Sequence, residues 1–185
     1  MTAARERRPP PKITASYIEN AALHYLERFA SSTANLKRVL MRKVDRSLAH
    51  WGGERPEALQ MVETVLTRLA GLGYLDDAAY AANKVRGLHR RGTSGRGIRA
   101  VLAAKGVAAE QADAALGTLA EDADEPELAA CLNLARRRRL GPFRKPETQA
   151  EFRDKDMAAL ARAGFGWDVV KRVMAGETDL SGWSR

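Results

Sequence analysis

Apolar positions recur along the chain with the period of a helix, and they form three consecutive sets of three segments. In the first set, one segment runs from Ile18 to Phe29 and a second from Leu36 to Leu48, with Gly52-Gly53 as a break. Ser16 and Glu19 have the spacing of a capping box, which predicts the start of the first helix there. Pro56 is placed to open the third helix, and Gly71 and Gly73 follow its last apolar position.

The second and third sets repeat this plan. The spacing predicts helices near residues 77–91, 95–105 and 109–120, and then near 126–140, 147–163 and 167–175. Leu160 to Phe165 resembles Leu102 to Val107 at an offset of 58 residues, and a short helix with an acidic first turn follows each. We find no convincing strand pattern. The prediction is an all-α protein, an elongated array of three tandem three-helix repeats.

These patterns also predict the limits of the parts. We expect a disordered basic arm at residues 1–13, because it combines arginines with three consecutive prolines. Repeats follow at residues 14–73, 74–122 and 123–176, and a C-terminal tail occupies residues 177–185. The sequence leaves open whether this tail docks on the repeats or hangs free.

The chain is organised around residues 73–107. Asp76 stands where an N-cap would accept an orphan backbone N–H, and a glycine-rich turn at residues 92–97 separates two basic helices. The second of these helices carries Ile98, Val101 and Leu102 on one face and stops at Gly106, a residue suited to a left-handed cap.

Three motifs of this stretch resemble the central signature of the RecX family, bacterial regulators of the RecA recombinase. They are Gly73-Tyr74-Leu75-Asp76-Asp77, the glycine turn, and Ile98-x-x-x-Leu102-x-x-Lys105-Gly106-Val107. The resemblance extends over most of residues 14–176 and implies tandem three-helix repeats. We interpret Tyr74, Leu75, Ile98, Leu102 and Gly106 as structural positions of the pattern. The chain departs from the family pattern at Gly52-Gly53 and in its proline-rich arm, which leaves the N-terminal contacts open.

Charge is segregated along a chain whose formal net charge is +8. Seven cations and no acid lie between Lys84 and Lys105, seven acids follow, and a second basic block begins at Arg136. Contact of such blocks with phosphates is largely independent of base sequence. The alternative is a solvated surface paired with the acids of residues 121–127. The candidate partner- or DNA-binding residues are Arg86, Arg90, Arg91, Arg96, Arg99, Lys105, Arg136, Arg137, Arg138 and Arg139.

Catalytic and metal-binding patterns are not found. The glycine turn lacks the Lys-[Ser/Thr] ending of a P-loop, and the three histidines have no neighbours at ligand spacing. The single Cys131 lies on an apolar helix face beside Leu128 and Leu132, so we interpret it as a core residue. The expectation is a binding protein, not an enzyme, with no cofactor, no metal and no catalytic residue.

The resemblance and the charge pattern together predict a monomeric regulatory protein, and the single cysteine favours the reducing cytoplasm. The protein would bind the RecA filament, contact single- and double-stranded DNA through the DNA backbone, and modulate ATP hydrolysis and strand exchange in recombination, DNA repair and the SOS response. Inhibition is the expected direction, and the sequence leaves the sign of the effect open. The alternative is a stand-alone helical DNA-binding module acting as a transcriptional regulator, with a helix-turn-helix in residues 77–105. No membrane partner is expected, because no run of 18 apolar residues is present.

Overall fold

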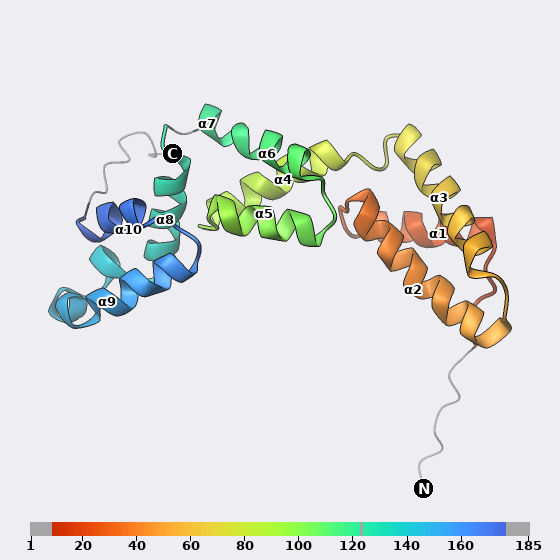
Figure 1. Ribbon diagram of the computed structural model, residues 1–185, viewed down its shortest axis with the longest axis horizontal. Helices are drawn as coiled ribbons and strands as arrows, with labels where there is room; N and C mark the ends of the chain where they lie inside the picture. The colour runs from red at the N-terminus through yellow and green to blue at the C-terminus, as the bar shows by residue number, and fades with distance from the viewer. Residues whose placement is uncertain (1–8, 123, 177–185) are drawn as a thin grey trace, which may run out of the picture. The chain divides into compact units, whose positions relative to one another are not determined.

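A computed structural model describes residues 9–122 and 124–176, and its regular structure is entirely helical (Figure 1). The helices are α1 (Ala15–Leu26), α2 (Thr33–Trp51), α3 (Arg55–Gly71), α4 (Asp77–Arg90), α5 (Gly95–Ala104), α6 (Ala109–Gly117), α7 (Leu119–Asp122), α8 (Pro126–Arg138), α9 (Pro146–Arg162) and α10 (Trp167–Met174), with a 3-10 turn η1 (Gly141–Phe143). The expected all-α class is therefore confirmed, as are the tandem sets α1–α3, α4–α6 and α8–α10.

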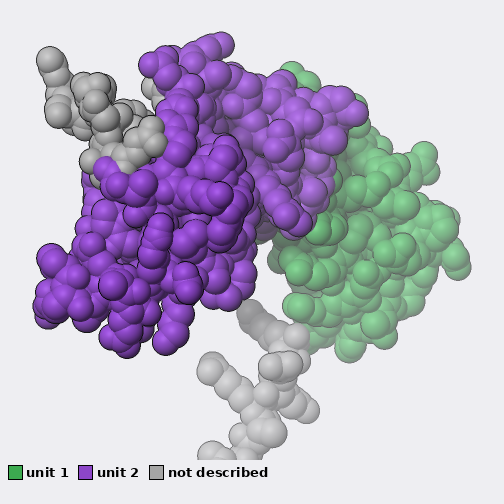
Figure 2. Space-filling view, turned by 60° about the vertical axis from the view of Figure 1, so that its left-hand side comes forward, with its two compact units in different colours: residues 1–80 green, residues 81–185 purple. Residues whose placement is uncertain are grey.

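The chain divides into two compact units, unit 1 at residues 1–80 and unit 2 at residues 81–185 (Figure 2). The first eight residues of the expected arm and the expected tail at residues 177–185 lie outside the described residues.

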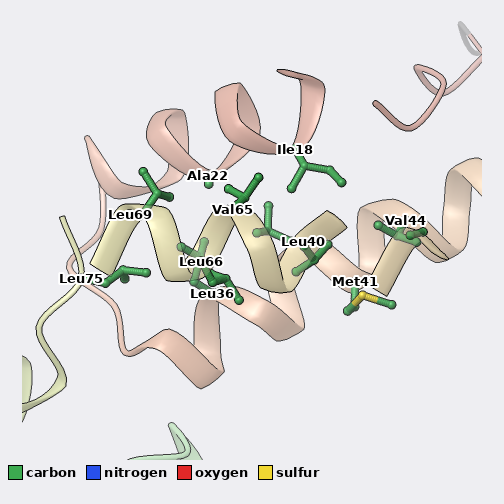
Figure 3. Close-up of a cluster of buried hydrophobic side chains, with 12 residues drawn as sticks. Ile18, Ala22, Leu36, Leu40, Met41, Val44, Val65, Leu66, Leu69 and Leu75 are labelled. Carbon is green, nitrogen blue, oxygen red and sulfur yellow. The ribbon is translucent and has the colours of Figure 1, made fainter. Parts of the chain in front are cut away.

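The core of unit 1 lies between α1, α2 and α3 (Figure 3). Ile18 of α1, Leu36 and Leu40 of α2, and Leu69 of α3 are almost completely buried, as the helical periodicity predicts. Asp77, at the start of α4, accepts hydrogen bonds from the backbone N–H and the hydroxyl of Thr33, at 2.7 and 3.1 Å. The beginning of α4 thereby satisfies an orphan donor at the N-terminus of α2.

The largest core of unit 2 lies where α8, α9 and α10 meet. Cys131 and Leu132 of α8, Leu160 of α9 and Val170 of α10 are buried there, which confirms Cys131 as a core residue. Burial, and secondarily the charge of Glu127, raise the pKa of the Cys131 thiol to about 12, so the thiol is protonated at neutral pH and a poor nucleophile.

Most local signals lie where the sequence indicates. Asp76 Oδ1 accepts the backbone N–H of Ala79 at 2.8 Å, which confirms the N-cap of α4. Gly106 has a positive φ of 75°, and the N–H of Val107 donates to the carbonyl of Leu102 at 3.1 Å, the bond of a Schellman motif. Helices α3, α5 and α9 all end in Leu-Ala-x-x-Gly followed by an apolar residue, so one stop signal recurs in the three sets.

Three details differ from the prediction. Helix α1 is capped by Thr14, whose Oγ1 accepts the N–H of Tyr17 at 3.1 Å, and the capping box at Ser16 is wrong. Phe29 lies beyond the end of α1 and is 55% exposed, with its ring centroid 5.3 Å from that of Tyr25. The predicted helix at residues 109–120 divides into α6 and α7 at Thr118, whose hydroxyl donates to the carbonyl of Ala115, a local bond that competes with the helical ladder.

Candidate functional site

The bend between α4 and α5 is held by bonds to distant parts of unit 2. Ser94 is fully buried; its Oγ accepts the N–H of Gly97 at 3.2 Å and donates to the carbonyl of Ala163 at 2.7 Å. The N–H of Gly95 donates to Glu127 Oε1 at 2.6 Å. Since these groups are already bonded within the protein, the glycine turn is a helix connection, as expected, and offers no phosphate cradle.

Gly92, in the turn of the first basic block, packs against α8, the helix that carries the second basic block. A Cβ placed on Gly92 would lie 2.8 Å from Leu134 Cα and 2.9 Å from the carbonyl oxygen of Ala130, and would collide with the backbone nitrogen of Leu134. The turn carrying Arg90 and Arg91 therefore lies directly on the backbone of α8, at Ala130 and Leu134, and Leu134 is two residues before the second block.

The first basic block is mostly exposed. The side chains of Arg86, Arg90, Arg91, Arg96 and Arg99 are exposed, while that of Lys105 is half-buried. Arg86 donates to the side-chain oxygen of Asn83 at 2.9 Å, and Arg99 is paired with Asp113 at 2.6 Å. Within the described part of the chain, Arg90, Arg91 and Arg96 have no ion-pair partner. These three guanidinium groups, and that of Arg86, whose bond is to a neutral amide, are available to an anion.

The second basic block, Arg136 to Arg139, is exposed at all four positions. The guanidinium of Arg136 lies 5.3 Å from the ring centroid of Phe143, and the backbone of Arg139 is left-handed with φ 55°. In residues 9–122 and 124–176 none of the four forms an ion pair.

Glu125 and Glu127, two of the acids expected to pair with this block, have other partners. Glu125 is bound in a bidentate manner by Arg172, with both N–O distances 2.7 Å, and this hydrogen bonding lowers the pKa of Glu125. Glu127 accepts the backbone N–H of Gly95. In the structure, therefore, neither Glu125 nor Glu127 pairs with the second basic block.

Arg144, next in the basic sequence, has a structural position. Its guanidinium binds the buried carboxylate of Asp156 at 2.9 and 2.7 Å, which raises the pKa of Arg144 and lowers that of Asp156. Unlike the exposed arginines of the second basic block, Arg144 is therefore engaged within the fold.

Two features of unit 1 escaped the sequence reasoning. Arg38, Arg42 and Arg46 of α2 are exposed at i, i+4, i+8 spacing, which places them in one stripe, and this spacing alone was a sufficient signal. Tyr74, interpreted as structural, is 58% exposed, and the neighbouring Leu72 is 60% exposed. The other four family-pattern positions are buried or, for Gly106, conformationally required.

Chemistry-bearing side chains do not converge in the described residues. No group of three or more His, Cys, Asp or Glu side chains there is arranged to hold a metal ion. The buried His89 has its Nε2 2.7 Å from the carbonyl oxygen of Pro126, a bond that fixes α4 to the start of α8. None of the described helices is long and apolar enough to cross a bilayer.

Comparison with known proteins gives consistent matches. Residues 76–116 match the family model described as "RecX, second three-helix domain". The regulatory protein RecX of Myxococcus xanthus (strain DK1622) is 45% identical over 173 residues, covering 92% of this chain and 91% of that protein. The regulatory protein RecX of Agrobacterium fabrum (strain C58) is 34% identical over 170 residues, covering 92% and 88%.

Two solved structures share the fold. A crystal structure of regulatory protein RecX aligns with a TM-score of 0.61 at 25% identity, covering 87% of this chain and 71% of that one. RecX from Lactobacillus salivarius aligns with a TM-score of 0.62 at 22% identity, covering 90% and 97%. Because the chain is 45% and 34% identical to two RecX proteins over about nine tenths of their lengths, it belongs to the RecX family of regulatory proteins, as the signature at residues 73–107 indicated.

Proposed function

We propose that this chain is a non-catalytic regulator that binds RecA or its nucleoprotein filament. It restrains the ATP hydrolysis and DNA strand exchange of that filament in recombination, repair and the SOS response. Family membership supports the choice of partner, because the RecX family comprises regulators of the RecA recombinase.

The observation that carries the proposal is a group of exposed arginines of the two basic blocks that form no ion pair among the described residues, namely Arg86, Arg90, Arg91, Arg96 and Arg136 to Arg139. Unpaired guanidinium groups can bind phosphate or carboxylate oxygens without first breaking an internal pair. Arg86, Arg99 and Lys105 belong to the same proposed surface, with Arg99 held in place by Asp113.

Binding of this kind is directed at the DNA backbone or at acidic protein surfaces. The two blocks contain no Phe, Tyr or Trp, and His89 of the first block is buried, so they provide no platform on which bases would stack. Contacts made by several helices to successive sites along a filament reinforce one another through effective concentration. A regulator bound in this way would obstruct the second DNA that strand exchange requires.

The stand-alone DNA-binding alternative is less favoured. A recognition helix enters the major groove with its N-terminal residues on base edges, whereas Ser94 and Gly95 at the N-terminus of α5 are buried and bonded to Ala163 and Glu127. Of the first turn of α5, only the Arg96 side chain is exposed.

The test is ATP hydrolysis by RecA on single-stranded DNA, with this protein titrated in below equimolar amounts. We expect inhibition, and we expect Arg90→Ala/Arg91→Ala to need at least about tenfold more protein for the same effect, since hydrogen bonds to charged groups contribute that much or more. The control is Arg55→Ala/Arg68→Ala. It removes the same charge from exposed arginines that are already paired with Asp45 and Glu19.

Two outcomes would contradict the proposal. If hydrolysis is unchanged at every ratio while the protein binds bare duplex DNA tightly, the stand-alone module is correct. If both double variants weaken inhibition equally, the inhibition depends on the net charge of the protein and not on Arg90 and Arg91.

A further inference from the structure

The proline-rich segment before α1 lies against the C-terminal end of α2. The indole N–H of Trp51 donates to the carbonyl oxygen of Pro10 at 2.6 Å, and the hydroxyl of Ser47 donates to that of Pro11 at 2.8 Å. The ammonium group of Lys12 lies 5.2 Å from the centroid of the Trp51 ring. Three consecutive residues of the segment are thus held by two side chains one helical turn apart.

Ser47 is the more informative of the two donors. It is 2% exposed, and it occupies a core-facing position of α2 between the apolar residues Val44 and Leu48. A buried serine within a helix usually bonds a carbonyl of its own preceding turn. Here the hydroxyl instead donates outside the helix, to Pro11. Without that acceptor the buried hydroxyl would lose its bond, which is unfavourable.

The segment is equally suited to the site. Proline has no backbone N–H, and the extended polyproline helix has no internal hydrogen bonds, so the carbonyls of Pro10 and Pro11 are free to accept. A groove of about 230 Å³ continues from these contacts, and its walls include Ile13, Trp51 and Met61. Ile13 then packs on the core of unit 1, which fixes the direction of the chain into α1.

We propose that Ser47 and Trp51 form a recognition site for an extended proline-rich segment, which residues 9–12 of the same chain occupy. Proteins generally bind polyproline helices in grooves lined by aromatic side chains, and here the indole N–H of Trp51 donates to a carbonyl of the proline run beside a groove that the same ring lines. The consecutive prolines restrict the free segment in advance, so little conformational entropy is lost on docking.

The site gives the arm a fixed point of attachment on α2. Arg5, Arg7 and Arg8 precede the docked prolines in the sequence, and Arg46 of the α2 stripe precedes Ser47.

Trypsin cleavage after Lys12 tests the site in the full chain, because the protease must draw the Lys12–Ile13 bond away from α2. Ser47→Ala removes one donor, and Trp51→Phe removes the other while keeping an aromatic ring. We expect each change to accelerate this cleavage about fivefold and the double variant about 25-fold, as the loss of one and two net hydrogen bonds implies. The matched control is Thr64→Ala/Trp167→Phe, which removes an exposed hydroxyl and an exposed indole elsewhere.

Cleavage after Lys12 at the same rate in the native protein, the control and the double variant would overturn the proposal. Thermal melting followed by circular dichroism identifies any variant that loosens unit 1 as a whole. If the double variant melts at a lower temperature than the native protein, the cleavage rate of the Trp51→Phe single variant is the test of the site. The Trp51 side chain is half-exposed and contributes little to the core, so this change leaves the stability of unit 1 nearly unchanged. None of these measurements involves RecA or DNA, so the result is independent of the proposed function.

Discussion

Asp156 is the residue at which α9, η1 and the chain after α8 are joined by charge. Its carboxylate is 2% exposed, accepts two hydrogen bonds from Arg144, and accepts the N–H of Gly141 at 2.8 Å. The Arg144 bonds, assisted by that N–H, lower the pKa of Asp156, although burial alone acts in the opposite direction. The ionised form is therefore favoured in the folded state over the unfolded state.

This shift predicts a specific pH dependence. A carboxyl group with a lowered pKa stabilises the fold above its unfolded pKa, about 3.9, and the contribution is lost as the pH falls through the lower folded value. Asp156→Asn should lower the free energy of unfolding by about 1.5–3 kcal/mol at pH 7 and flatten the loss of stability below pH 4, as measured by urea denaturation. Glu125→Gln, which disrupts a more exposed arginine pair, is the control and should have a much smaller effect. Equal losses for the two variants would contradict the assignment.

Arg139 is a second residue whose backbone is informative. It is the non-glycine residue with positive φ in the described part of the chain, at the position where glycine ends α3, α4, α5 and α9. Left-handed backbone is unfavourable for an L-residue with a Cβ by roughly 1–2 kcal/mol. An arginine at this position is understandable if its charge is needed.

Replacing Arg139 by glycine should therefore raise stability and weaken binding together. We expect Arg139→Gly to increase the free energy of unfolding by about 1 kcal/mol, since glycine adopts this conformation without strain. Binding to single-stranded DNA, measured by fluorescence anisotropy, should fall at the same time. Arg139→Lys keeps both the charge and the strained backbone, so it should match the native protein in both measurements. A glycine variant no more stable than the lysine variant would show that the backbone is relaxed.

At the scale of the elements, the sequence predicts the helix starts and ends that depend on residues close together in the chain. The Asp76 cap, the Pro56 start and the Gly106 stop act over three or four residues, and all are visible in the sequence. The capping box at Ser16 failed because Thr14 offers the same chemistry two residues earlier, and local pattern does not rank the two.

The bonds that join distant elements were not predictable. Ser94 and Ala163 are 69 residues apart, and Gly95 and Glu127 are 32 apart. Serine and glutamate are common in solvent-exposed turns and helix starts, so nothing in their spacing reveals these partners. For the candidate surface, the sequence identified the cations, but only the structure separates Arg90, Arg91 and Arg96 from the paired Arg99 and Arg144.

The contact between the α4–α5 turn and α8 leads to a prediction in three glycine variants. Gly92→Ala combines left-handed backbone with collision against the backbone of Leu134, so unit 2 should lose about 3 kcal/mol or more. Gly73→Ala has a similar φ of 78° in open space and should lose only the strain, about 1 kcal/mol. Gly87→Ala, within α4 and in open space, should gain about 0.5–1 kcal/mol. Urea denaturation checks the order; a Gly92→Ala loss no larger than that of Gly73→Ala would mean that α8 moves aside.

At the scale of the whole molecule, binding of an anion depends less on the net charge than on how many cations are free of an ion pair. The formal net charge is +8, but among the described residues six cations already lie in ion pairs: Lys37, Arg55, Arg68, Arg99, Arg144 and Arg172. An anion that binds a paired cation must compete with a carboxylate already in place. Net charge alone would predict that any arginine contributes equally to binding DNA, whereas pairing predicts that the exposed blocks contribute most.

Salt dependence separates these two views. Each phosphate contact on a single strand contributes about −0.7 to the slope of log K against log salt concentration. Arg137→Ala/Arg138→Ala/Arg139→Ala should therefore make the slope shallower by as much as about 2.1, three times that value. Lys37→Ala/Arg55→Ala/Arg68→Ala lowers the formal net charge by the same three units, from +8 to +5, but removes paired cations, so its slope should stay close to that of the native protein. The measurement is binding to single-stranded DNA by anisotropy at several salt concentrations. Equal changes in slope for the two triple variants would mean that binding follows net charge, and the second basic block would then have no special part in it.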